Sequence, residues 1–242
     1  GLPEIADPLA RRAVQWSLTV AYRKERRFEE LVRTADAILA ADPGSRPALA
    51  RKLLALERLG RTADVEAALK AAHAAAPEDP SVQSMSASAR LARGDLEGAN
   101  RAYRQLIDGG KATPGDFNNA AWLLLWSEPV GDTAVDWARR AVEGNGRRQY
   151  ASLNTLAAVL AAAGRPAEAR EVFLQALDAK ESVALEGADW LVQGLIAERY
   201  GLAGAAVAAY ARVKDGPDDD PGDPTRPSQF ARRRLGRLPP AR

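Results

Sequence analysis

The sequence predicts an all-α protein, a right-handed superhelical solenoid of about six stacked helical hairpins followed by a short capping helix. Three observations support this prediction. Apolar residues recur at spacings of three and four, the period of a half-buried helix. Turn residues recur 34 positions apart, as Gly60 and Gly94 or Pro43 and Pro77 do. Alanine dominates the 46% of residues that are hydrophobic, and it forms helices well but fills little volume, so the helices must pack closely.

The clearest hairpin covers residues 150–177, where two helical runs flank Gly164. Leu156 and Leu160 lie on one face of the first run. Gly164 ends that run because glycine adopts the left-handed backbone conformation at little cost. Pro166 suits the first turn of the next helix, where a missing N–H costs nothing. A hairpin of this size cannot bury its own apolar face, so it needs neighbours on either side.

The other elements follow from the same turn and cap residues. Asp7-Pro8 begins a first helix that ends at the charged turn Lys24–Arg27, and Phe28–Ala40 forms the second. The repeats are expected at about 12–45, 46–79, 80–113, 114–149, 150–183 and 184–214. The last hairpin is expected to turn at Gly201 and to continue its second helix to Val213.

The composition changes after residue 214. Residues 215–225 form an acidic loop rich in proline and glycine, which cannot be helical. Residues 226–242 are basic, and Ser228–Leu238 is expected to form a helix with Phe230 and Leu235 on its apolar side. Because a solenoid needs a terminal element that covers its last open face, this helix is interpreted as a cap.

One side-chain pattern recurs in the second helices: a small residue, a bulky one four positions on, and a small or apolar one three further on. It occurs as Ala99/Tyr103/Leu106, Ala169/Phe173/Ala176 and Ala206/Tyr210/Val213. With the shared period, the chain resembles the tetratricopeptide repeat (TPR) family over roughly residues 12–213. The first two repeats depart from the family pattern, with Arg26 in place of the turn glycine and with Leu31 and Val65 at positions where a small residue is usual.

The resemblance implies a non-enzymatic scaffold that binds a protein or peptide segment in a concave groove lined by the first helix of each hairpin. The groove stripe implied by the register is Trp16 and Val20, Ala50 and Leu54, Ser84 and Ser88, Asn118 and Trp122, Asn154 and Ala158, and Leu191 and Leu195. The candidate binding residues are Ser84, Ser88, Asn118, Trp122, Trp126 and Asn154.

These residue types suit peptide recognition. An asparagine amide both donates and accepts hydrogen bonds, so it can bind a peptide backbone, and a tryptophan offers a large apolar contact. In the alternative interpretation, Asn118 and Asn154 bond to neighbouring helices and Trp122 fills the core.

The charge pattern does not favour a nucleic-acid partner. The 34 basic and 32 acidic residues are interspersed and give a net charge of +2, which is typical of a solvated surface. The basic groups at residues 23–27, 147–148 and 232–234 lie far apart in sequence. Binding of a polyanion would need these groups on one continuous face, so it is kept only as a second alternative.

No catalytic, cofactor or metal site is expected. His73 is the single histidine, and no cysteine is present to pair with it or to form a disulfide or a thiolate metal site. The stretch Asp108–Lys111 lacks the glycine spacing of a phosphate loop. The acidic residues at 218–220 and 223 lack the spacing of a calcium-binding loop, so a solvated linker is expected there.

The remaining expectations concern context. A first alternative to the scaffold is a structural or dimerising spacer, and hence a homo-oligomer, cut from a larger multidomain protein. No membrane span and no signal peptide is visible, so a soluble protein of the cytoplasm or periplasm is expected. The start at Gly1 suggests a mature product or a piece of a longer chain, and 28 arginines against six lysines suggest a bacterial source.

Overall fold

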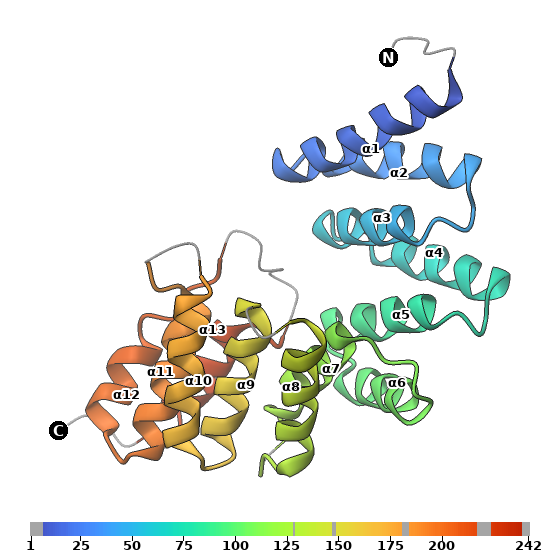
Figure 1. The fold of residues 1–242 in the computed structure, drawn as a ribbon. Helices are drawn as coiled ribbons and strands as arrows, with labels where there is room; N and C mark the ends of the chain where they lie inside the picture. Colours follow the sequence, from blue (N-terminus) through green and yellow to red (C-terminus); the bar gives the residue numbers. More distant parts are fainter. Residues whose placement is uncertain (1–6, 128, 147–148, 181–183, 217–223, 239–242) are drawn as a thin grey trace. The chain divides into compact units, whose positions relative to one another are not determined.

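The computed structural model describes residues 7–127, 129–146, 149–180, 184–216 and 224–238, and within these ranges the chain is all-α, as predicted. The helices follow one another along the chain as hairpins (Figure 1). In order they are α1 (Pro8–Lys24), α2 (Phe28–Ala41), α3 (Arg46–Arg58), α4 (Thr62–Ala75), α5 (Pro80–Ala92), α6 (Leu96–Asp108), α7 (Pro114–Leu124), α8 (Asp132–Gly144), α9 (Tyr150–Ala162), α10 (Pro166–Asp178), α11 (Gly187–Arg199), α12 (Ala203–Tyr210) and α13 (Pro227–Leu235).

The chain divides into two compact units, Gly1–Met85 and Ser86–Arg242, with the boundary inside α5. In the first unit, α2 packs against both α1 and α3, and α3 packs against α4. Large aliphatic side chains fill its core. The fully or almost fully buried ones include Leu31, Ile38, Leu56 and Val65. Leu31 and Val65, where the TPR pattern usually has small residues, therefore serve this unit as core residues.

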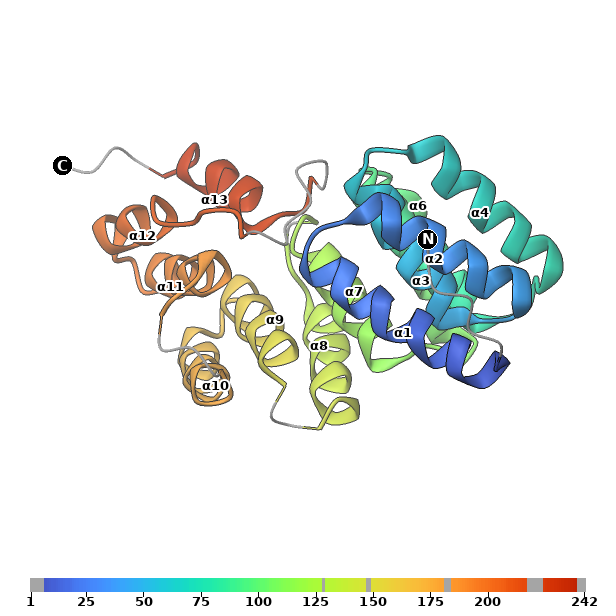
Figure 2. The same cartoon turned by 90° about the horizontal axis from the view of Figure 1, so that it is seen from above.

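The second unit is built largely from pairs of helices that form hairpins. Helix α7 pairs with α8, α9 with α10, and α11 with α12, and α9 also packs against α7 and α11. Figure 2 shows α7, α9 and α11 in a row, with α8 and α10 on one side of it. We call the other side of this row the inner face. Tyr103, Phe173 and Tyr210 belong to the continuous buried core of this unit.

Backbone conformation confirms the expected turns. Gly60, Gly94, Gly164 and Gly201 all have φ between 68° and 81°, the left-handed region. Arg26 occupies the equivalent turn of the first hairpin with φ 57°. Among the described residues it is the only non-glycine residue with a left-handed backbone conformation. A side chain in this conformation costs about 1–2 kcal/mol because Cβ crowds the following carbonyl.

We expect Arg26→Gly to stabilise the first unit by about 0.5–1 kcal/mol, because the relief of strain exceeds the extra entropy of an unfolded glycine. The matched control is Gly60→Ala, at φ 68° with nothing within 4 Å of the added methyl group. It should destabilise by about 1 kcal/mol for the same reason. Denaturant titration followed by circular dichroism measures both, and a destabilising Arg26→Gly would contradict the account.

The sixth hairpin differs from the expectation at its end. Helix α12 stops at Tyr210 and not at Val213, because the chain turns there and passes directly over the start of α11. A Cβ at Gly187 would overlap the carbonyl oxygen of Lys214, so this close approach requires glycine. The predicted sites at Asp218, Asp219, Asp220 and Asp223, the pair Arg147 and Arg148, and residues 239–242 of the tail lie outside the described residues.

No helix in the described ranges is both long enough and apolar enough to cross a membrane.

Candidate functional site

The C-terminal segment, which we define as residues 224–238, lies across the inner face of the second unit. Its helix α13 packs against α11 and α12. Figure 2 shows it on the side of α9 and α11 that is turned away from α10. The segment therefore covers more than the last hairpin, and it lies on the surface where the TPR resemblance placed a ligand.

Two tryptophans of the fourth hairpin hold the start of this segment. The indole Nε1 of Trp122 donates a hydrogen bond of 2.9 Å to the backbone carbonyl of Thr225. The rings of Trp126 and Phe230 meet edge to face, with their centroids 5.2 Å apart and their planes at 88°. Phe230 is only 1% exposed, so this aromatic contact is shielded from water and anchors the segment through apolar packing.

Charged side chains hold the end of α13. Arg233 donates to the backbone carbonyl of Trp126 at 3.2 Å. Arg234 binds both carboxylate oxygens of Glu198 on α11, with Nε 3.0 Å from Oε2. Such a bidentate pair is among the stronger charged hydrogen bonds, and this one is largely shielded, since the side chains of Arg234 and Glu198 are 11% and 19% exposed.

The same carboxylate also positions a tyrosine of α12. Tyr210 donates its hydroxyl hydrogen to Glu198 at 2.8 Å. Burial of the Tyr210 ring and the negative charge of Glu198 raise the pKa of this hydroxyl, so it stays a donor. Glu198 therefore links the core of the last hairpin to the docked C-terminal segment.

Burial along α9 agrees with this arrangement. Every residue from Ser152 to Ala162 is buried. An inner helix of an open solenoid leaves one stripe exposed, whereas a helix buried all round has a neighbour on every side. Helices α7, α8, α10 and α11 supply most of these neighbours, and Phe230 and Ala231 of α13 join the same buried cluster. The buried side of the C-terminal segment is therefore continuous with the core around α9.

Asn154 lies inside the repeat stack rather than on a free surface. It is 4% exposed, and its amide donates to Asp189 of α11 at 3.3 Å and to the Tyr150 hydroxyl at 3.4 Å. The Asp189 carboxylate is fully buried and also accepts hydrogen bonds from the Tyr150 hydroxyl (2.6 Å), Lys180 Nζ (2.8 Å) and the backbone N–H of Glu186 (2.8 Å). This arrangement matches the alternative interpretation, in which the asparagine bonds to a neighbouring helix.

The charges in this cluster stabilise one another. Burial lowers the pKa of Lys180, but its hydrogen bond to Asp189 and the two nearby carboxylates outweigh burial and raise that pKa. Burial and the bond to Asp189 both raise the pKa of Tyr150, which keeps its hydroxyl protonated. The cluster therefore joins the fifth and sixth hairpins as a structural link.

The other candidate residues have separate surroundings. The Ser88 hydroxyl lies 3.0 Å from the Tyr103 hydroxyl, inside the third hairpin. The amide oxygen of Asn118 and the indole nitrogen of Trp126 are buried without a hydrogen-bond partner among the described residues. Ser84 belongs to the first unit. The structure thus brings Trp122 and Trp126 together on the surface that holds the C-terminal segment.

Sequence reasoning did not identify Glu198, Thr225 and Arg234 as part of this surface. One signal was present, because residues 156–163 are apolar without interruption, and such a run predicts a helix with no free face. The position of the segment on the inner face had no sequence signal. The contact between Trp122 and Thr225 joins residues 103 positions apart, far beyond the repeat period.

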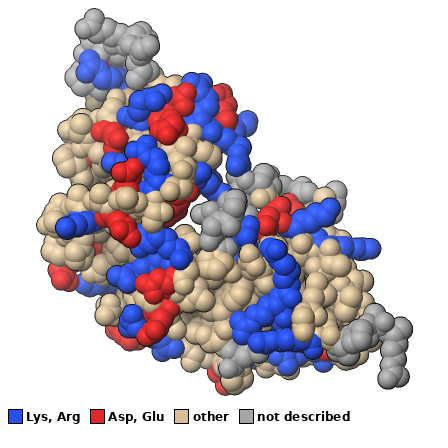
Figure 3. All heavy atoms as spheres, turned by 180° about the vertical axis from the view of Figure 1, so that it is seen from behind, with Lys and Arg blue, Asp and Glu red and all other residues tan. Residues whose placement is uncertain are grey.

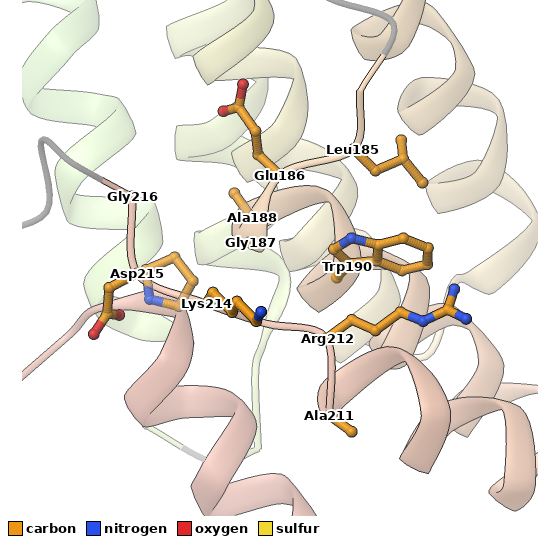
Figure 4. A pocket seen from close by; sticks show the side chains of 11 residues that line it. Leu185, Glu186, Gly187, Ala188, Trp190, Ala211, Arg212, Lys214, Asp215 and Gly216 are labelled. Atoms are coloured by element: carbon orange, nitrogen blue, oxygen red, sulfur yellow. The ribbon is translucent and has the colours of Figure 1, made fainter.

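A pocket of about 790 Å³ opens beside the segment, between the start of α11 and the end of α12 (Figure 4). The guanidinium of Arg212 lies 4.6 Å from the centre of the Trp190 ring. The acids in the lining are paired, Glu186 with Lys180 at 3.3 Å and Asp215 with Arg226 at 2.8 Å. No group of His, Cys, Asp or Glu side chains suited to a metal ion occurs in the described part of the chain.

No family model and no curated protein matches the chain. Solved structures do match it. The chain is similar to PilW, described as a widely conserved type IV pilus biogenesis factor, at 16% identity and a TM-score of 0.64, over 85% of this chain and 92% of the other.

Two further likenesses are to a tetratricopeptide repeat protein from Parabacteroides merdae and to YrrB, described as a TPR protein with an unusual peptide-binding site. The first has 12% identity and a TM-score of 0.58, covering 96% of this chain and 86% of the other. The second has 11% identity and a TM-score of 0.53, covering 84% and 98%. At these identities the likenesses concern the fold.

Proposed function

Because the chain has a TPR-like helical-repeat fold, we propose that it is a non-enzymatic scaffold that binds a protein segment on the inner face of its second unit. The observation that carries the proposal is the segment already lying there. This surface contacts a polypeptide through its backbone, through an apolar anchor and through a charged pair, at Trp122, Trp126 and Glu198 respectively. A surface with these three kinds of contact can recognise a sequence.

The structural likeness to YrrB supports the proposal, since YrrB is described as having a peptide-binding site on a TPR fold. The proposed binding residues are those of the inner face, Trp122 and Trp126, with Asn118 in line with them on the same helix face four residues before Trp122. Ser88 and Asn154 remain proposed as supporting positions, with Asn154 acting through its hydrogen bonds inside the repeat stack. Ser84 remains proposed as a separate contact within the first unit.

Photo-crosslinking in the native organism tests the proposal. A photoreactive phenylalanine analogue replaces Trp122 in one chain and Leu174 in the control chain. Leu174 is 47% exposed on α10, which is not part of the inner face. We expect intermolecular adducts with a partner from position 122 and not from position 174. Adducts that form at position 174 but not at position 122 would place the partner elsewhere and refute the proposal.

The first unit supports a second candidate function, a spacer that self-associates. Leu9 and Val20 are 78% and 59% exposed, and they lie eleven residues apart on α1, which places them on one side together with Trp16. Sedimentation of the full chain at several concentrations separates the two functions. A dimer that Val20→Glu dissociates would favour the spacer, and a monomer at every concentration would exclude it.

The polyanion alternative receives less support. The last turn of α13 carries Arg232, Arg233 and Arg234, and Figure 3 shows basic side chains gathered on this face of the second unit. Arg233 and Arg234 are already bound to Trp126 and Glu198. Their charges therefore serve the docking of α13.

A further inference from the structure

We propose that the C-terminal segment is an internal competitor for the inner face, and that the partner it excludes is a helix bearing an aromatic residue and, four positions later, an arginine. This inference rests on the proposed function and names the chemistry of the ligand. It is drawn from the contacts of Phe230 and Arg234, which lie on one side of α13 because they are four residues apart.

The aromatic requirement follows from the packing of Phe230. Its ring is 1% exposed and stands edge-on against Trp126, and Ala231 beside it is 2% exposed. Such a closed site suits a flat ring next to a small residue, since an aliphatic side chain would lose the edge-to-face contact. A partner helix without an aromatic residue at this position would leave the site partly unfilled.

The requirement for arginine follows from Glu198. This carboxylate is 19% exposed and accepts from both Arg234 and Tyr210. If α13 left without a replacement, a shielded negative charge would lose its cation, which is costly. Arginine suits the site better than lysine because its guanidinium binds two carboxylate oxygens at once. An acidic residue at the same position would be repelled.

A partner can displace the C-terminal segment because α13 is only marginally stable as an isolated helix. It has nine residues, and isolated helices shorter than about 12–15 residues are marginal in water. Its hold on the inner face therefore depends on docking and on its covalent attachment. A short connection gives an attached segment an effective concentration near the millimolar range, so a free partner must bind with better contacts or be locally concentrated.

The test uses a fluorescent synthetic peptide of residues 224–238 and the full chain. Three chains are compared: the unaltered chain, Phe230→Ala/Arg234→Ala, and the control Arg232→Ala. Arg232 is exposed and donates to Ser228 within α13. We expect the double variant to bind the peptide about tenfold or more tightly than the unaltered chain, because its own segment competes less. The control should match the unaltered chain.

A charge exchange checks recognition without depending on the double variant. A chain with Glu198→Arg should repel Arg234 of its own segment, and it should bind a peptide that carries glutamate in place of Arg234. The unaltered peptide should bind this chain at least about tenfold more weakly than the exchanged one. A failure of this reversal would overturn the assignment of Glu198 as the arginine-selecting group.

The remaining outcomes are also decisive. If the unaltered and double-variant chains bind the peptide with equal affinity, the C-terminal segment does not compete for the inner face. If no chain binds the peptide, the inner face does not recognise an aromatic residue followed by an arginine. A dimer that the peptide dissociates would mean that the segment is exchanged between copies, and would overturn the internal arrangement. None of these results removes the proposed function, which fails separately if crosslinking places the partner away from position 122.

Discussion

Asp189→Asn is expected to lower the free energy of unfolding of the second unit by about 3–5 kcal/mol, the cost of breaking a buried ion pair. The Asp189 carboxylate is fully buried and accepts hydrogen bonds with both oxygens, from Tyr150 and Asn154 on one and from Lys180 on the other. Asparagine has a single acceptor oxygen. Its amide hydrogens would face donors, and Lys180, which is 7% exposed, would lose its buried partner and keep only Glu186, which is 63% exposed.

Denaturant titration of the full chain measures this effect, with Asp136→Asn as the matched control. Asp136 is exposed on α8, and its replacement should change the stability by less than about 0.5 kcal/mol. In Lys180→Met/Asp189→Asn the buried cation is gone as well, so part of the loss should be recovered. A loss below about 1 kcal/mol for Asp189→Asn would show that the cluster does not join the fifth and sixth hairpins as argued.

Gly194→Ala is expected to destabilise the second unit by about 1–3 kcal/mol, although alanine is the better helix former. The added methyl group would overlap the ring of Tyr210, which is 2% exposed and cannot move into solvent without cost. Any shift of the ring also strains the bond between its hydroxyl and Glu198. The substitution should therefore loosen the docked α13 as well.

The control is Gly204→Ala in α12, where nothing lies within 4 Å of the added methyl group. There we expect a gain of about 0.5 kcal/mol from helix propensity and from a less flexible unfolded chain. The same substitution at two positions of one hairpin is thus expected to change the free energy of unfolding in opposite directions. Equal effects would mean that the contact between Gly194 and Tyr210 does not constrain the hairpin.

The repeat architecture was predictable because it is encoded locally. Turn glycines such as Gly164, and proline at the first turn as in Pro166, are needed wherever this backbone geometry recurs, and they recur at a fixed period. Arg26 breaks the rule, yet its turn still forms with φ 57°. Packing of the neighbouring helices overrides the preference of a single residue.

The candidate site was predictable in part. The register placed Trp122 and Trp126 on one helix side, and they contact the C-terminal segment. The register also placed Asn154 there, but a repeat pattern does not indicate that Asp189 of the next hairpin will bind its amide. The position of α13 had no local signal, because it depends on contacts such as Arg234 with Glu198, 36 residues apart. Such contacts are decided by the surface that the finished stack presents.

The most direct test of the docked C-terminal segment is a nuclear Overhauser measurement on the full chain, with tryptophan and phenylalanine selectively labelled. The ring centroids of Trp126 and Phe230 lie 5.2 Å apart, so their edge protons are close enough to give cross-peaks. We expect such cross-peaks, and we expect Glu198→Arg to weaken them. Assigned rings without any cross-peak in the unaltered chain would contradict the claim that the segment occupies the inner face.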